Sequence, residues 1–226
     1  MYGREYNGKT YTLEASGGLI NGSLVMQDKE TDSYWFIMSD EVISGELKGT
    51  KIKELPISTK MRWKDWVKKH PNTLVLSVKG KEDVAFNRYE NYFASTEGFR
   101  GLKAKDTRLH TKQPIYSFHF EGEAYAVPYF LMEDGRSFEL REDLRVFFYR
   151  PKEADILHST VAYFSHSGNF QKKKDAWIHE SSNCIFDSNS SLFTGGNGNC
   201  PTRLNGFDTF WYNWSLNNPG TKILTE

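Results

Sequence analysis

One tryptophan-containing segment occurs twice in this chain, and it constrains the fold more than any other feature. The segments cover residues 61–76 and 209–224 and align without a gap. Since tryptophan is a rare residue, the match predicts two diverged copies of one building block, which is a pseudo-symmetric pair rather than a solenoid. The shared positions are Trp63, Trp66, Pro71, Thr73 and Leu76, which correspond to Trp211, Trp214, Pro219, Thr221 and Leu224.

Within each copy the pattern predicts a short helix followed by a strand. Trp63, Trp66 and Val67 stand at i, i+3 and i+4, which places them on one helix face. Pro71 ends this helix, expected over about residues 60–70, and residues 73–78 favour a strand. We therefore expect the indoles of both copies to pack in the core rather than form a ligand platform.

The rest of the chain favours strands. It has 16 Phe and 12 Tyr, and Asn7-Gly8 is a typical two-residue hairpin turn. Residues 146–149 are apolar on both faces and predict a central buried strand, whereas the Ser, Asn and Gly of residues 181–199 predict a loop. The expected fold is β-rich α+β: two pseudo-repeated antiparallel or mixed sheet units, each with a short Trp-containing helix.

The domain organisation follows from the repeat. We expect a first repeat over residues 1–79, a connecting segment over 80–113 and a second repeat over 114–226, together forming one compact unit. Weaker matches pair Gly8 with Gly168 and Asp28 with Asp187. The first copy has no counterpart of the strands predicted within residues 116–149, so we expect it to be incomplete at its N-terminal side.

Composition excludes several function classes. Lys plus Arg and Asp plus Glu number 29 each, and this balance argues against nucleic-acid binding. No apolar run approaches the roughly 20 residues of a transmembrane helix, and the polar start of the chain is not a signal peptide. No nucleotide fingerprint or compact histidine motif occurs, so we expect no cofactor and no metal, and the sequence identifies no partner.

Two groups of residues are candidates for binding. Arg4, Asp28 and Trp35 either line a pocket or serve as a structural ion pair and turn residues. The connecting segment contributes an aromatic and polar cluster, since long loops are often functional. Its candidate residues are Arg88, Tyr89 and Tyr92.

The chain has two cysteines, Cys184 and Cys200. Either they are unrelated thiols or they form a disulfide, which would contribute roughly 3 kcal/mol of stability by closing the loop between them.

A set of short stretches spread over nearly the whole chain, on both repeats, is informative when taken together. They include Arg4, Asn7-Gly8, Tyr11-Thr12-Leu13, Leu24-Val25-Met26, Asp28, Trp35, Gly45-Glu46-Leu47, Leu55-Pro56, His70-Pro71, Gly122-Glu123-Ala124, Trp211, Trp214 and Pro219. In these stretches the chain resembles a bacterial family, the domain of unknown function 3179.

The resemblance implies a periplasmic or cell-surface location, because members of this family typically carry a secretion signal or a lipoprotein anchor. It also implies a strand with a Cys-x-x-Cys-like motif ahead of Met1, in some members apparently with selenocysteine. A selenocysteine codon read as a stop would restart the frame at Met1 and truncate the chain. Two functions stay open: a thiol or selenol redox role with the reactive motif upstream, and a non-enzymatic ligand- or partner-binding or scaffold module.

Overall fold

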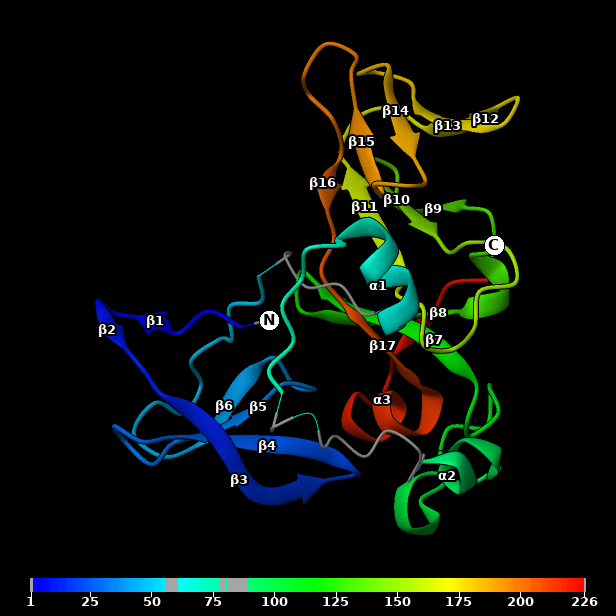
Figure 1. Ribbon diagram of the computed structural model, residues 1–226. Coiled ribbons are helices and arrows are strands. Elements are labelled where there is room, and N and C mark those ends of the chain that lie inside the picture. Colours follow the sequence, from blue (N-terminus) through cyan, green and yellow to red (C-terminus); the bar gives the residue numbers. More distant parts are fainter. Residues whose placement is uncertain (1, 56–60, 78–79, 81–88, 226) are drawn as a thin grey trace.

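A computed structural model describes residues 2–55, 61–77, 80 and 89–225 of the chain. Strands dominate this structure and form four four-stranded sheets and a small hairpin (Figure 1). Neighbouring strands pair antiparallel, with the exception of one parallel pair described below. The expected β-rich α+β class, with mixed sheets and short Trp-containing helices, is confirmed.

The first repeat is built from local hairpins. Asn7 and Gly8 have φ angles of 51° and 74°, and Asn21 and Gly22 have 48° and 82°. Both turns need left-handed backbone at two consecutive residues, a conformation that Asn-Gly adopts easily. The Asn7-Gly8 turn joins the two strands of a small hairpin, and the Asn21-Gly22 turn joins two strands of a four-stranded sheet. The strands are β1 (Glu5–Tyr6), β2 (Lys9–Thr10), β3 (Leu13–Ile20), β4 (Ser23–Asp28), β5 (Tyr34–Phe36) and β6 (Glu41–Ser44).

A second sheet, which we call the central sheet, has the strand order β17-β7-β8-β18. Its strands are β7 (Pro114–Phe120), β8 (Glu123–Pro128), β17 (Phe207–Phe210) and β18 (Lys222–Ile223). The short strand β18 pairs parallel with β8, because the helix between β17 and β18 carries the chain back across the sheet. This sheet therefore joins residues that are about a hundred positions apart in the sequence.

The third sheet contains the strand that the sequence places in the core. Val146, Phe147 and Phe148 are all 0% exposed, which confirms a central buried strand. They lie on β10, with β9 on one side and β11 and β16 on the other. The bounds are β9 (Arg136–Arg141), β10 (Leu144–Tyr149), β11 (Val161–Ser165) and β16 (Thr202–Arg203).

A fourth sheet stands at the top of the molecule in Figure 1 and corrects the loop expected over residues 181–199. Two strands cross that stretch, and Cys184 and Phe186 are buried between exposed neighbours. Their inward residues pack on the buried face of β10. The strands are β12 (Phe170–Lys173), β13 (Ala176–His179), β14 (Cys184–Asp187) and β15 (Leu192–Thr194).

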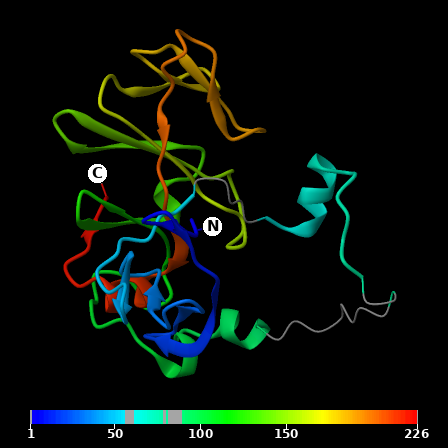
Figure 2. The same ribbon diagram turned by 90° about the vertical axis from the view of Figure 1, so that its left-hand side faces the viewer.

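The helices are short, and none in the described part of the chain has the length and apolarity that a membrane span requires. They are α1 (Trp63–Lys69), α2 (Glu90–Ala94) and α3 (Trp211–Asn217), together with the 3-10 turns η1 (Phe99–Gly101) and η2 (Tyr129–Leu131). Figure 2 shows α1 standing away from the body, whereas α3 is enclosed by it. A core cluster around α3 joins both repeats, since Val25 and Phe36 pack with Trp211 and Trp214.

The prediction that all the repeat indoles are core residues is wrong for the first copy. Trp211 and Trp214 are 0% exposed, but Trp63 is 54% exposed. The strand expected after Pro71 is also missing over residues 73–77, where the chain has no strand partner. The exposed indole and the missing strand have the same physical cause. A helix face is buried only where another surface packs on it, and among the described residues no sheet covers α1.

Candidate functional site

The candidates Asp28 and Trp35 bind each other. Trp35 Nε1 donates to Asp28 Oδ2 at 2.8 Å, and the Thr31 N–H donates to Oδ1 at 2.6 Å. Burial by itself would raise the pKa of Asp28, but the hydrogen bonds from Trp35 and Thr31 outweigh it and hold that pKa below its usual value. Both residues are 0% exposed, so they stabilise the β4–β5 turn and offer no accessible atom to a ligand.

The second repeat contains the same turn chemistry. Asp187, at the end of β14, accepts hydrogen bonds from Asn189 N–H (2.9 Å) and from the Ser190 hydroxyl (2.7 Å). The Asp187 carboxylate also accepts the backbone N–H of Ser190, three residues later, just as the Asp28 carboxylate accepts the N–H of Thr31. Asp187 is exposed, and no tryptophan donates to it among the described residues.

Arg4 lies apart from the Asp28–Trp35 pair. Its Nε donates to the Tyr11 carbonyl at 2.8 Å, and the side chain is exposed. Arg4 lines an open cavity of about 410 Å³ together with Tyr2, Lys53 and other residues of the first repeat. The structure therefore does not assemble Arg4, Asp28 and Trp35 into one pocket.

Near this cavity are two partly buried carboxylates. Burial raises the pKa of Glu54 to about 7, and the negative charge of Asp40 contributes to the rise. Burial also raises the pKa of Asp40. Glu54 stands on the backbone between the lining residues Lys53 and Leu55, so a proton acceptor that titrates near neutral pH lies at the edge of the cavity.

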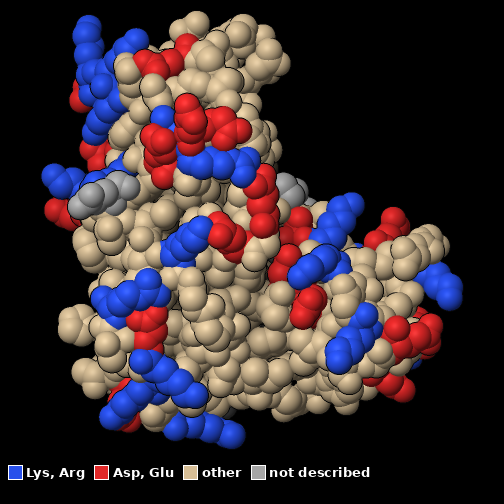
Figure 3. Space-filling model, turned by 180° about the vertical axis from the view of Figure 1, so that it is seen from behind, with Lys and Arg blue, Asp and Glu red and all other residues tan. Residues whose placement is uncertain are grey.

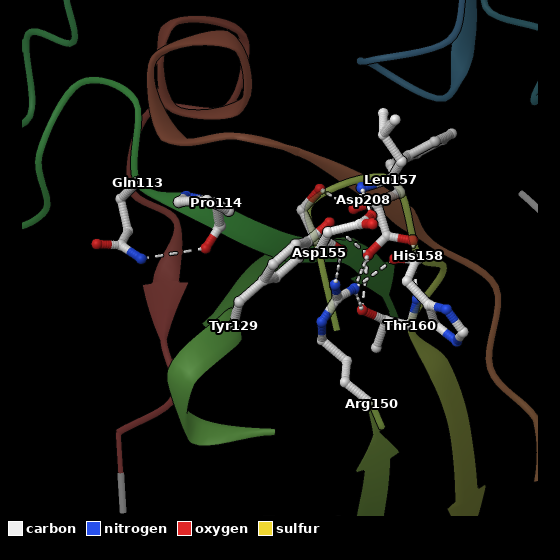
Figure 4. Close-up of polar contacts among 11 residues, drawn as sticks. Gln113, Pro114, Tyr129, Arg150, Asp155, Leu157, His158, Thr160 and Asp208 are labelled. Atoms are coloured by element: carbon white, nitrogen blue, oxygen red, sulfur yellow. Dashed lines mark hydrogen bonds and ion pairs between the residues drawn. The ribbon is translucent and has the colours of Figure 1, made fainter. Parts of the chain in front are cut away.

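A buried arginine organises the second repeat (Figure 4). Arg150 is 1% exposed and follows strand β10 directly. Its Nη1 donates to the His158 carbonyl at 2.6 Å, and its Nη2 donates to the Asp155 carbonyl at 2.8 Å. The guanidinium carbon lies 3.6 Å from the ring centroid of Tyr129, a cation–π distance.

The carboxylate of Asp208 completes this cluster. It lies 3.5 Å from Arg150 Nη1 and accepts hydrogen bonds from Tyr129 (2.8 Å) and from the Thr160 hydroxyl (2.6 Å). Burial and then the positive charge of Arg150 lower the pKa of the neighbouring His158. Because the charges face one another inside the fold, the Arg150 cluster fastens residues 150–160 to β17, the strand that leads into α3.

Among the three candidates of the connecting segment, Tyr92 has a described contact with the body of the protein. Arg88 lies outside the described residues, and Tyr89 is 67% exposed. Tyr92, on α2, shares a hydroxyl–hydroxyl hydrogen bond of 3.0 Å with Tyr212 on α3. Burial and this hydrogen bond raise the pKa of Tyr92 well above its usual value, so its hydroxyl stays protonated.

Lys112 is a functional candidate that the sequence did not indicate. Its Nζ lies 3.9 Å from the ring centroid of Tyr92 and 4.7 Å from that of Phe210, and it donates to the Tyr92 carbonyl. Burial lowers the pKa of Lys112. The ring contacts join positions far apart in the sequence, which is why spacing alone does not reveal them.

Two cavities are lined in part by Lys112 and the rings that it contacts. One, of about 580 Å³, is lined by the connecting segment and includes His110 and Lys112. The other, of about 270 Å³, we call the junction cavity, because its walls come from both repeats and the connection. The junction cavity is lined by Gly22, Ser23, Leu24, Ile37, Met38, Tyr92, Thr209, Phe210, Tyr212 and Asn213.

Close packing fixes one wall of the junction cavity. The Tyr212 ring lies against Gly98, where an added Cβ would be 2.6 Å from the ring. The Tyr212 hydroxyl also accepts the Phe99 N–H at 3.2 Å. On the floor, Ser23 donates to Asn213 Oδ1 at 2.9 Å, and the Asn213 side chain donates to the Asn21 carbonyl at 3.3 Å. These bonds hold α3 against the first repeat.

The two cysteines form a disulfide in the structure, with their Cα atoms 5.6 Å apart. Cys184 is 0% exposed on β14, and Cys200 is partly exposed just before β16. The bond ties the top sheet to the chain that returns to β16. The described residues contain no group of three His, Cys, Asp or Glu side chains placed to hold a metal ion.

Charge is mixed on the surface seen from behind in Figure 3. Basic and acidic side chains alternate there around a broad uncharged area, as the net charge of zero leads one to expect. That face therefore shows no large field of one sign on its described residues.

The chain matches no curated protein and no solved structure. A family model does match it, over residues 1–221 of the 226. This protein belongs to the family described as "Protein of unknown function (DUF3179)".

Proposed function

We propose that this protein is an extracytoplasmic, non-enzymatic binding module that holds a small neutral ligand in the junction cavity. The observation that carries the proposal is the origin of the cavity walls: Ser23 comes from the first repeat, Tyr92 from the connection and Tyr212 from the second repeat. Ligand sites occur preferentially where structural units meet. A ligand in the junction cavity would therefore contact the first repeat, the connecting segment and the second repeat.

The lining chemistry supports a neutral ligand. Phe210 and Met38 supply apolar surface, and the hydroxyls of Tyr92 and Tyr212 supply groups that donate and accept hydrogen bonds. The lining residues include no Lys, Arg, Asp or Glu. A charged ligand would lose its hydration there without an opposite charge in return.

The disulfide supports the extracytoplasmic location. Such bonds persist in secreted and periplasmic proteins and are rare in the reducing cytosol. The bond between Cys184 and Cys200 joins a buried sulfur to a loop that is rich in Gly and Asn. Fractionation of cells that express the tagged protein tests this location, and recovery in the cytosolic fraction with reduced thiols would contradict it.

A fragment screen by ligand-observed NMR tests the site. We expect neutral aromatic or polyhydroxyl fragments to bind the wild type and to lose at least tenfold in affinity on Tyr92→Ala, because that change removes a wall of the junction cavity. Tyr34→Ala is the matched control, since Tyr34 is an exposed tyrosine on β5. Fragments that bind both variants equally well would show that the site lies elsewhere.

A thiol or selenol redox role is the second candidate, with a reactive motif ahead of this chain. The partial exposure of Cys200 favours it, since a thiolate could reach that sulfur while Cys184 stays buried. We nevertheless expect the chain alone not to reduce insulin, because both of its cysteines are oxidised in one disulfide. Insulin reduction that disappears on Cys184→Ser would reverse the order of the two candidates.

A further inference from the structure

The cavity of about 580 Å³ that Lys112 lines has no role in the function proposed above. We call it the Lys112 cavity. Its walls are residues 95–97 and 110–114 of the connecting segment, together with Lys103. Small-molecule sites in proteins have volumes of about 300–1,000 Å³, so the Lys112 cavity is large enough to hold a ligand of its own.

The walls of the Lys112 cavity are fixed to α3, which runs beside the connecting segment in Figure 1. Behind one wall, the Phe99 N–H donates to the Tyr212 hydroxyl at 3.2 Å. On the other wall, the Tyr212 N–H donates to the Thr111 carbonyl at 2.9 Å. The Trp211 N–H donates to the Gln113 carbonyl, also at 2.9 Å. Because hydrogen bonds hold the backbone on both sides, the cavity is preformed, and a ligand would lose little free energy in ordering it.

The ammonium group of Lys112 has a positive charge without a matching negative one. Its Nζ lies 3.9 Å from the ring centroid of Tyr92 and 4.7 Å from that of Phe210, and it donates to the Tyr92 carbonyl. The ring of Phe93 is a third neighbour, at 5.9 Å. Within the described part of the chain, no Asp or Glu forms an ion pair with Lys112. The rings and one carbonyl therefore stabilise a cation that is partly removed from water and not neutralised.

The other polar groups of the walls suit an anion. Glu97 is the carboxylate among the lining residues, and Lys103 pairs with it at 2.8 Å, so this pair adds no net charge. The Ser95 hydroxyl accepts the Glu97 N–H at 3.1 Å, and the Thr111 hydroxyl accepts the Ala104 N–H at 3.3 Å. Each hydroxyl also has a hydrogen to donate, so the walls offer donors around one unneutralised positive charge.

We propose that the Lys112 cavity binds a small organic monoanion through its carboxylate group. The carboxylate supplies the missing negative charge at Lys112 and accepts a hydrogen bond from a wall hydroxyl such as that of Thr111. One ammonium balances one negative charge, so a carboxylate fits better than a doubly charged phosphate, whose second charge would lose its hydration without a partner. This site does not depend on the neutral ligand proposed for the junction cavity, since the two cavities share no lining residue.

Titration of the isotope-labelled full chain with benzoate, followed by two-dimensional NMR, tests the site. At low ionic strength we expect saturable shifts of the Thr111 and Lys112 amide signals with a Kd of about 1–10 mM, since a single charge-assisted contact gives only weak binding. Benzamide has the same ring and no charge. It should bind at least about tenfold more weakly, because it cannot neutralise the Lys112 ammonium.

Three variants locate the charge that the anion meets. Lys112→Met should weaken benzoate binding at least about tenfold, because it removes the ammonium and keeps a side chain of similar length. Glu97→Gln should tighten binding about threefold, because Lys103 then loses its partner and adds a second positive charge to the cavity. Lys173→Met is the matched control, since Lys173 is an exposed lysine of β12, and it should leave the affinity unchanged.

Four results would overturn the proposal. One is the absence of a saturable shift up to about 100 mM benzoate, which means negligible affinity. Equal affinities for benzoate and benzamide would show that charge does not matter, and unchanged binding on Lys112→Met would place the anion elsewhere. Shifts confined to Ser23 and Leu24 would assign it to the junction cavity. If Lys112→Met does not fold, Glu97→Gln decides alone, because binding that this change weakens or leaves unchanged contradicts the proposal.

Discussion

Helices α1 and α3 have the same tryptophan spacing and the same end geometry, but their surroundings are opposite. Trp66 Nε1 donates to the Thr73 hydroxyl at 2.8 Å on an exposed helix. Trp214 is 0% exposed, and its Nε1 has no hydrogen-bond partner within the described structure. The local sequence therefore determines the shape of this unit, and the neighbouring sheet determines whether it is buried.

Replacing the first tryptophan of each helix gives the largest expected contrast. Trp211→Ala should cost about 3–5 kcal/mol of unfolding free energy, because it leaves a cavity in the shared core. Trp63→Ala should cost at most about 0.5 kcal/mol, since its side chain is mostly in water. Urea denaturation followed by circular dichroism measures both, and equal costs would contradict the structure.

The two arginines that reach Asp155 provide a second contrast. Arg150 bonds the Asp155 carbonyl from inside the fold, whereas Arg62, next to α1, pairs with the Asp155 carboxylate at the surface. Arg150→Leu should cost about 3 kcal/mol, because it leaves Asp208 buried without its cation. Arg62→Leu should cost less than about 1 kcal/mol. Similar midpoints for both variants in a urea titration would show that the Arg150 cluster is dispensable.

A third contrast compares Asp28 and Asp187, the two aspartates that accept hydrogen bonds in turns between strands. Asp28→Ala should cost about 2 kcal/mol, because the buried Trp35 N–H loses its acceptor. Asp187→Ala should cost clearly less, since its partners can bond water. The pKa of Asp28 is lowered in the fold, so its contribution is full above the usual aspartate pKa and is lost as pH falls. The cost of Asp28→Ala, measured by unfolding at both pH values, should therefore be larger at pH 7 than at pH 3.

The smallest effect concerns Glu54, whose carbonyl accepts the Asn205 side chain at 3.2 Å and so joins the repeats. Its pKa of about 7 in the fold exceeds the usual value of 4.5, so stability falls as pH rises between these values. Glu54→Gln should raise the unfolding free energy at pH 8 by about 1 kcal/mol, after discounting for partial exposure, and should change nothing at pH 4. An equal gain at both pH values would rule out this ionisation as the cause.

The features that the sequence predicts correctly are local ones. The Asn7-Gly8 turn, the buried β10 strand and the helix after Arg62 each follow from neighbouring residues. The hairpin formed by β14 and β15 was missed because its Ser, Asn and Gly content is typical of loops. Its alternation was a usable signal, since Cys184 and Phe186 face inward and Ile185 faces out.

The site was less predictable than the fold. The Arg150 cluster joins β10 to Asp208, and the aromatic group around Lys112 joins α2 to β17, so both depend on tertiary contacts that spacing does not encode. The composition of the connecting segment predicts Tyr92 as a candidate, but nothing in the sequence pattern indicates its partner Tyr212. The predicted burial of Trp63 is wrong because helical periodicity shows which face of a helix is apolar but not whether another part of the chain packs on that face.

The parallel pairing of β18 with β8 has a consequence during synthesis. The four strands of the first-repeat sheet follow one another in the chain, so that sheet can form as soon as residue 44 has left the ribosome. The central sheet must wait for Lys222 and Ile223, which are made about a hundred residues after their partners on β8. Until then the edge of β8 that these two residues will cover is open, and other segments of the nascent chain can pair with it.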